Sequence, residues 1–383
     1  MKFTSALVTV ASLGFVTASP FSNANDPAGL EGIPRKVSVE GQDLLYPQTW
    51  HVKPRQSIQH AIKSASRGDH IVVEAGTYRE QLTINKDGIE LIGHGAILTP
   101  PKKAVKNQCS GLSGENTEVG ICVIGTGVKL SAFQAEHRRV LSVKKPVKDV
   151  SVSGFDVRGF SGINIAVVGA KNARVVNNKL TDGAKYGALT LGSYDTFISN
   201  NKVTATLLGF IGICNDNFSG VLITKNHVAN HIIGLCIQTP GADIQYNEVT
   251  ASCFGAFVDP GVKGAKIRHN HFGPSNAACE KIGVSGIILD GAIKTLVRDN
   301  VIEGQKNGGT GAGIVVVDDE CNKTGPELSL SCIILGRKAV SKDNLIIGNT
   351  LRDNDFDLFI NTAGSGNVAK CNTCSTPAAL CAM

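Results

Sequence analysis

A six-residue pattern recurs along the second half of the chain: VVNNKL at residues 175–180, ISNNKV at 198–203, ITKNHV at 223–228 and IQYNEV at 244–249. Three further copies begin at Ile267, Val297 and Ile346. The shared asparagine is followed by the next one after 23, 25, 21 and 23 residues in the first five copies. Most copies are followed by a second short apolar stretch that begins at glycine. The period therefore corresponds to one unit of two or three short strands.

Units of this size have too little apolar surface to form separate cores, but stacked units bury a continuous one. The sequence therefore predicts an all-β solenoid of the parallel β-helix class. Equivalent residues would lie one rung apart, about 4.8 Å, so that identical amides can hydrogen-bond along the stack. We expect a structural ladder of Asn178, Asn201, Asn226, Asn247, Asn270, Asn300 and Asn349.

The N-terminal part of the chain predicts a cap for the open end of the stack. Apolar residues at 58, 61, 62 and 65 have helical spacing, with Ser57 as an N-cap and Gly68 as a stop. We expect a signal peptide at residues 1–18, an extension at 19–50 and a single β-helix domain at 51–383. Loop insertions are expected near residues 101–122, 273–282 and 319–341.

The expected signal peptide consists of Lys2, an apolar run over residues 6–16 and a small-residue cleavage site. It predicts a secreted, extracellular protein, and eleven cysteines agree with an oxidising compartment. Disulfides are expected to close the segments 109–122 and 321–332, with pairing also open among Cys371, Cys374 and Cys381. Two sequons predict glycosylation at Asn217 and Asn322.

The composition argues against two classes of partner. The formal net charge is +6, and no block of basic residues is interleaved with aromatic ones, so nucleic acid is not expected as a partner. No later apolar run reaches the roughly 18 residues that a membrane helix needs, so no membrane association is expected either.

The segment from Ser57 to Leu98 resembles the first coils of pectin methylesterases and related right-handed β-helix proteins. The later asparagine-bearing coils resemble the pectate-lyase-like superfamily, over roughly residues 50–370. The resemblance implies a right-handed β-helix and a lyase, hydrolase or epimerase that acts on a polyuronate. Methylesterase activity is not expected, because Gln238 is followed by Thr239 instead of aspartate and Arg337 lacks the family's Pro-Trp.

Strand alternation predicts a column of polar side chains on the outside of the helix. If the first and third residues after each glycine point inward, the fourth points outward. That position is occupied by Asp216, Gln238, Asp259 and Asp290 on successive coils. Asp259 and Asp290 are the first catalytic candidates, with Asp216 as a third carboxylate and Gln238 as a substrate-binding residue. Close carboxylates suit acid/base catalysis or a hard cation, although the same segments also resemble ordinary turns.

A second, basic column offers a rival site. It lies next to the ladder asparagines and contains the alternative catalytic candidates Arg268, His271 and His227, with Lys202 and Arg298 as binding residues. Such groups can hold carboxylates or abstract a proton beside one. The alternative interpretation is a solvated polar face. The two columns are expected on different faces of the β-helix.

Taken together, these features predict a secreted enzyme that acts on an acidic polysaccharide. Two alternatives remain open: an enzyme of small-molecule cyclisation or isomerisation, and a non-catalytic binding protein. A groove along several coils would favour a polymer, and a closed pocket would favour a small molecule. The sequence leaves the cofactor undetermined: Ca²⁺ is compatible with the acidic column, but no residue requires it. The oligomeric state is likewise undetermined.

Overall fold

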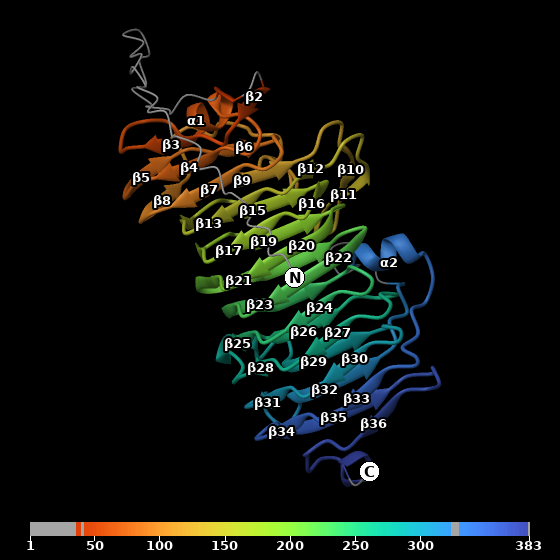
Figure 1. Cartoon of the computed structure of the whole chain (residues 1–383). Helices are drawn as coiled ribbons and strands as arrows, with labels where there is room; N and C mark the ends of the chain where they lie inside the picture. The colour runs from red at the N-terminus through yellow and green to blue at the C-terminus, as the bar shows by residue number, and fades with distance from the viewer. Residues whose placement is uncertain (1–35, 40–41, 323–328, 382–383) are drawn as a thin grey trace, which may run out of the picture.

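The computed structural model describes residues 36–39, 42–322 and 329–381 (Figure 1). The expected signal peptide and the first part of the N-terminal extension lie outside these residues. Strands β1 (Lys36–Val39) and β2 (Gln42–Leu45) form a separate antiparallel pair. Within the described residues, no helix has the length and apolar character that crossing a membrane requires.

The rest of the chain winds into stacked coils whose strands pair in parallel with the coils above and below. The predicted right-handed parallel β-helix is therefore confirmed. A complete coil contributes one strand to each of three faces. The first face begins at β3 and is made of β3 (Thr49–Val52), β4 (His70–Val73), β7 (Glu90–Gly93), β12 (Val147–Lys148), β13 (Ser151–Ser153), β16 (Ala170–Lys171), β17 (Arg174–Val176), β20 (Tyr194–Ser199), β22 (Ser219–Thr224), β24 (Asp243–Gln245), β27 (Lys266–Arg268), β30 (Leu296–Arg298), β33 (Leu345–Ile347) and β36 (Val368–Lys370).

The second and third faces share two long strands, β21 (Lys202–Asp216) and β23 (His227–Ile237), which turn the corner between them. The second face also contains β5 (Gly76–Arg79), β8 (Ala96–Thr99), β14 (Asp156–Arg158), β18 (Lys179–Thr181), β25 (Glu248–Thr250), β28 (His271–Phe272), β31 (Val301–Glu303) and β34 (Thr350–Arg352). The third contains β6 (Leu82–Ile84), β9 (Val119–Ile124), β15 (Ile163–Val168), β19 (Tyr186–Leu191), β26 (Phe254–Val258), β29 (Ser285–Asp290), β32 (Ala312–Val317) and β35 (Phe356–Asn361).

The N-terminal end is capped by α1 (Ile58–Ser64), as the apolar spacing predicts. Ser57 is its N-cap, and the Ser57 hydroxyl accepts a hydrogen bond from the backbone N–H of His60. The helix ends at Ser64, four residues before the expected stop at Gly68. In the part of the chain that the structure describes, three short helical segments lie outside the coils: η1 (Ala277–Cys279), α2 (Leu330–Leu335) and α3 (Ala378–Cys381).

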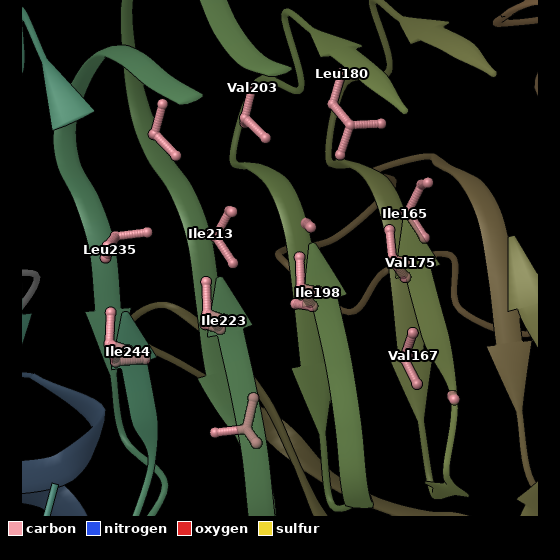
Figure 2. Close-up of a cluster of buried hydrophobic side chains, with 14 of the residues drawn as sticks. Ile165, Val167, Val175, Leu180, Ile198, Val203, Ile213, Ile223, Leu235 and Ile244 are labelled. Atoms are coloured by element: carbon pink, nitrogen blue, oxygen red, sulfur yellow. The ribbon is translucent and has the colours of Figure 1, made fainter. Parts of the chain in front are cut away.

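The interior is filled by aliphatic side chains that repeat on each rung (Figure 2). On the first face, Ile198, Ile223 and Ile244 are fully buried and lie in register on paired strands. On the third face, Ile213 and Leu235 are buried as predicted from their distance to the preceding glycine. This inward set fixes which side chains of each strand point outward.

The asparagine ladder is confirmed and includes one more residue, Asn372. Each Nδ2 donates to the Oδ1 of the asparagine on the next coil, and that oxygen also accepts the backbone N–H of the preceding ladder residue. For Asn226, a second bond from Nδ2 reaches the buried carbonyl of Ile198. The ladder thus satisfies polar atoms in a corner that water does not reach.

Five disulfides join described cysteines. Cys109–Cys122 and Cys321–Cys332 are the two expected pairs, and Cys374–Cys381 leaves Cys371 free and exposed. The pairs Cys214–Cys236 and Cys253–Cys279 are not anticipated by the sequence analysis, because their members lie a whole coil or an insertion apart.

Candidate functional site

The predicted acidic column lies where the strands of the third face end. Asp216 and Asp290 are the last residues of β21 and β29, and Gln238 and Asp259 directly follow β23 and β26. Strand register places Asp216, Gln238, Asp259 and Asp290 on four successive rungs. The column therefore has the order that the sequence predicts.

Two insertions contact this column. One is the hairpin of β10 (Lys129–Gln134) and β11 (His137–Ser142), which the sequence analysis does not anticipate. The other carries α2, which lies beside the middle coils although it follows them in sequence by many residues (Figure 1). Between them is a cleft of about 560 Å³ lined by Arg139, Val140, Asp216, Asn217, Phe218, Gln238, Pro240, Pro260, Gly261, Val262, Ser331, Ile334, Leu335 and Arg337.

Asp259 lies one layer behind the wall of the cleft and is only 3% exposed. Its Oδ2 accepts hydrogen bonds from Ser331 Oγ at 2.8 Å and from Gln238 Nε2 at 2.9 Å. Burial raises the pKa of Asp259 well above its usual value, and the nearby Glu136 carboxylate raises it further, against the lowering effect of the two donors. The surface position expected for Asp259 is therefore wrong, because α2 covers it.

Asp216 remains accessible and is held by a short chain of buried groups. His137 Nε2 lies 3.5 Å from Asp216 Oδ2, and His137 Nδ1 lies 3.1 Å from the Tyr186 hydroxyl. Burial and the neighbouring carboxylates raise the pKa of Tyr186 well above its usual value, so the hydroxyl keeps its proton. A hydroxyl that donates to Nδ1 leaves the imidazole proton on Nε2, directed at Asp216. This arrangement orients the Asp216 carboxylate.

Three buried polar atoms of cleft residues have no hydrogen-bond partner among the described residues: Arg139 Nε, Asn217 Oδ1 and Gln238 Oε1. A buried polar atom without a partner costs about 1–3 kcal/mol. All three atoms are shielded from solvent, so a ligand in the cleft would reach them only after the surrounding side chains move.

Asn217 lines the cleft, but its side chain is not exposed as glycosylation requires. Its side chain is buried, and Nδ2 donates to Thr196 Oγ1 at 2.7 Å. A glycan would be attached to this nitrogen, so we do not expect one in the folded protein. Asn322 is exposed, but the rest of its sequon lies outside the described residues, and its glycosylation stays a prediction.

The candidates of the basic column lie away from this cleft, on the first and second faces. Arg268 forms two hydrogen bonds with Asp243, at 3.1 and 2.8 Å. His227 and His271 are paired with glutamates on the next rungs, Glu248 at 3.1 Å and Glu303 at 2.9 Å. Arg298 pairs with its neighbour Asp299, and Lys202 is exposed on the second face. The structure thus separates these five residues from the acidic column.

Several residues in or behind the cleft wall are missed by the sequence reasoning. Glu136, His137 and Arg139 come from the hairpin, and Ser331 comes from the insertion around α2. These segments lie outside the repeat, so period and alternation do not place them. A possible signal is the charged run Glu136-His137-Arg138-Arg139 in an otherwise weakly charged chain.

Among the described residues, potential metal ligands gather at one place, where Asp319, Cys321 and Cys332 approach one another. Both cysteines are joined in a disulfide, so they lack the thiolates that a metal would need. This group therefore offers no metal site.

No protein-family model matches the sequence, and no curated protein matches it. The fold is similar to that of a double mutant of the periplasmic alginate epimerase AlgG, with a TM-score of 0.51 and 14% identity over 85% of each chain. It also resembles DFA-IIIase from Arthrobacter chlorophenolicus A6 in complex with GF2, with a TM-score of 0.49, 11% identity and coverage of 82% of this chain and 85% of that one. At such identities the similarity shows the parallel β-helix fold alone.

Proposed function

We propose that this protein is a secreted glycoside hydrolase that cleaves an acidic polysaccharide in the cleft beside Asp216. The observation that carries the proposal is the pairing of two unlike carboxyl groups at one cleft. Asp216 is accessible and oriented by His137, whereas burial favours the protonated form of Asp259. Glycoside hydrolysis needs one carboxylate and one carboxylic acid on opposite sides of the scissile bond.

In this proposal Asp216 is the general base. It removes a proton from a water molecule, whose oxygen attacks the anomeric carbon as the bond to the leaving sugar breaks. Asp216 and Asp259 lie two rungs apart, about 10 Å by strand spacing. This is near the upper limit for inverting enzymes, in which a water stands between the base and the sugar.

The leaving oxygen receives its proton from Asp259 through Ser331, which lines the cleft. In the structure Ser331 Oγ donates to Asp259, and the relay needs this hydrogen bond reversed, with the O–H of protonated Asp259 donating to Ser331 Oγ. Asp259 can then give its proton to Ser331 Oγ while Ser331 gives its own to the leaving oxygen. The reaction ends with Asp216 protonated and Asp259 ionised, and exchange with solvent restores both. Gln238 bonds both Asp259 and Glu136 and holds these carboxyl groups in place.

The length of the binding surface favours a polymer over a small molecule. A second cavity of about 640 Å³ shares Gly261, Leu335 and Arg337 with the cleft. Together they extend from the rung of Asp216 to the rung beyond Asp290, four intervals or about 19 Å. Two arginines, Arg139 and Arg337, suit a substrate with carboxylates.

The test is product analysis with acidic polysaccharides, including pectate and alginate, in water enriched in ¹⁸O. Hydrolysis predicts new reducing ends that carry the label at the anomeric carbon. Unsaturated products absorbing in the ultraviolet would indicate a lyase, and an unchanged chain length with altered sugar stereochemistry would indicate an epimerase. Either of these results would overturn the hydrolase proposal. It would also be overturned if the protein cleaves none of the glycans that it binds.

A further inference from the structure

Five of the twelve residues that line the second cavity are basic. We call its four exposed members Lys263, Lys294, Arg337 and Lys342 the basic pocket. Lys338 also lies there but is paired with Glu320 and lies near Asp318, so we leave it out. Asp343 is the acidic residue in the lining.

The position of these side chains is fixed by backbone pairing. Lys263 bridges to Ile293, and Ile293 bridges to Lys342, both in parallel register. The two lysines are therefore two rungs apart, about 10 Å. Gly291 allows the insertion to approach this closely, since a Cβ there would lie 2.3 Å from the Cβ of Ala339. The cavity wall is thus built into the coil.

The basic pocket brings four cationic side chains together at one cavity, whereas many basic side chains elsewhere are paired with acids. On the first and second faces, basic side chains repeatedly face an acidic neighbour, as in Arg268–Asp243, Arg352–Glu303 and Lys179–Asp156. Within the described chain, no ion pair joins any member of the basic pocket to an acidic residue. Like charges that gather without counter-charges repel one another, and an anionic ligand relieves this repulsion.

From this cluster and its continuity with the cleft, we propose that the basic pocket is an anion subsite for an acidic group of the glycan, carboxylate or sulfate. The inference rests on the proposed function and specifies it further. Arg337 lines both cavities, so one chain can occupy the cleft and the pocket together. The acidic units would lie on the side of the scissile bond that faces the C-terminal coils, and a neutral chain of the same length would bind more weakly.

The test measures binding by calorimetry in the Asp216→Asn background, where the ligand is not consumed. The probes are a galacturonate hexamer, its carboxyl-reduced neutral counterpart and a sulfated galactan hexamer. One variant carries Lys263→Gln, Lys294→Gln and Lys342→Gln. A control with the same change in charge carries Lys171→Gln, Lys225→Gln and Lys266→Gln, which are exposed and line neither cavity.

We expect the first variant to weaken binding of an anionic hexamer about tenfold, as three exposed ion pairs would predict, and to leave the neutral hexamer unchanged. The control should lose less than about twofold. The acidic hexamer that binds more tightly shows whether the basic pocket takes a carboxylate or a sulfate. Equal losses in both variants, or neutral and acidic hexamers that bind alike, would overturn the subsite. If the binding difference persists but wild-type protein releases no reducing ends, only the hydrolase proposal fails.

Discussion

Two polar columns run along the β-helix, one inside it and one on the outer side of its third face. The inner column repeats asparagine on eight successive rungs, from Asn178 to Asn372, and each amide bonds the next. The outer column changes at each rung, from Leu191 through Asp216, Gln238 and Asp259 to Asp290. Residues of the insertions bond to this column: Ser331 bonds to Asp259, and Glu136 bonds to Gln238. Regular repetition supports the scaffold, whereas variation under inserted loops produces the candidate site.

The largest effect is expected from the outer column. Asp216→Asn removes the proposed base, and loss of such a group slows catalysis by about 10²–10⁴-fold. Since Asp216 is partly exposed, the melting temperature should stay close to that of the wild type. Initial rates of reducing-end release and a thermal melt measure the two effects.

The matched control for Asp216 is Asp243→Asn, which removes a carboxylate from the first face and should keep the wild-type rate. If Asp216→Asn kept the wild-type rate, the outer column would not be catalytic. The contrast between a structural inner column and a catalytic outer column would then fail.

The inner column should respond in stability. Asn247→Leu leaves the backbone N–H of Asn226 without its acceptor and removes the side-chain donor to the carbonyl of Ile223. Asn226 Nδ2 loses one acceptor but keeps the carbonyls of Ile198 and Thr224. Two or more unsatisfied buried groups cost about 3–5 kcal/mol of unfolding free energy. Urea unfolding followed by circular dichroism measures the loss.

The neighbouring change Glu248→Gln, at an exposed position, should cost less than about 1 kcal/mol. A similar small loss for Asn247→Leu would mean that the ladder adds little to stability and that its regularity needs another explanation.

The sequence predicts the asparagine ladder more completely than the surroundings of the outer column. The asparagine period placed the ladder and the rungs, and alternation placed Asp216 and Asp259 on one outer column, because both patterns reflect strand geometry. It did not predict that Asp259 is buried or that His137 reaches Asp216. Those contacts depend on a hairpin and a helix that break the period, and their docking is set by long-range packing that local patterns do not encode.

A third prediction concerns the opposite effects of one residue on stability and activity. In the unfolded chain Asp259 titrates near its ordinary pKa of about 4, whereas in the folded protein its pKa is raised. As pH rises above about 4, the unfolded state releases the proton first, so stability falls with pH. Each unit of the shift corresponds to about 1.4 kcal/mol.

Asp259→Asn keeps an oxygen that accepts from Ser331 and Gln238, but it carries no charge. The variant should therefore be inactive, more stable than the wild type at neutral pH and no more stable near pH 3. Chemical unfolding across this pH range gives the difference. Equal stability at all pH values would show that the folded protein does not resist ionisation of Asp259.

The smallest effect is expected from the basic column, which is the competing site. Arg268→Ala breaks an ion pair whose side chains are 34% and 26% exposed, so the loss in unfolding free energy should stay below about 1 kcal/mol and shrink in high salt. Because Arg268 lies on the first face, the rate of glycan cleavage should not change. Unfolding at low and high salt, with rates measured on the same preparation, tests both statements. A tenfold fall in the cleavage rate would mean that the basic column takes part in catalysis. Pairing with a neighbouring acid would then no longer separate structural side chains from functional ones.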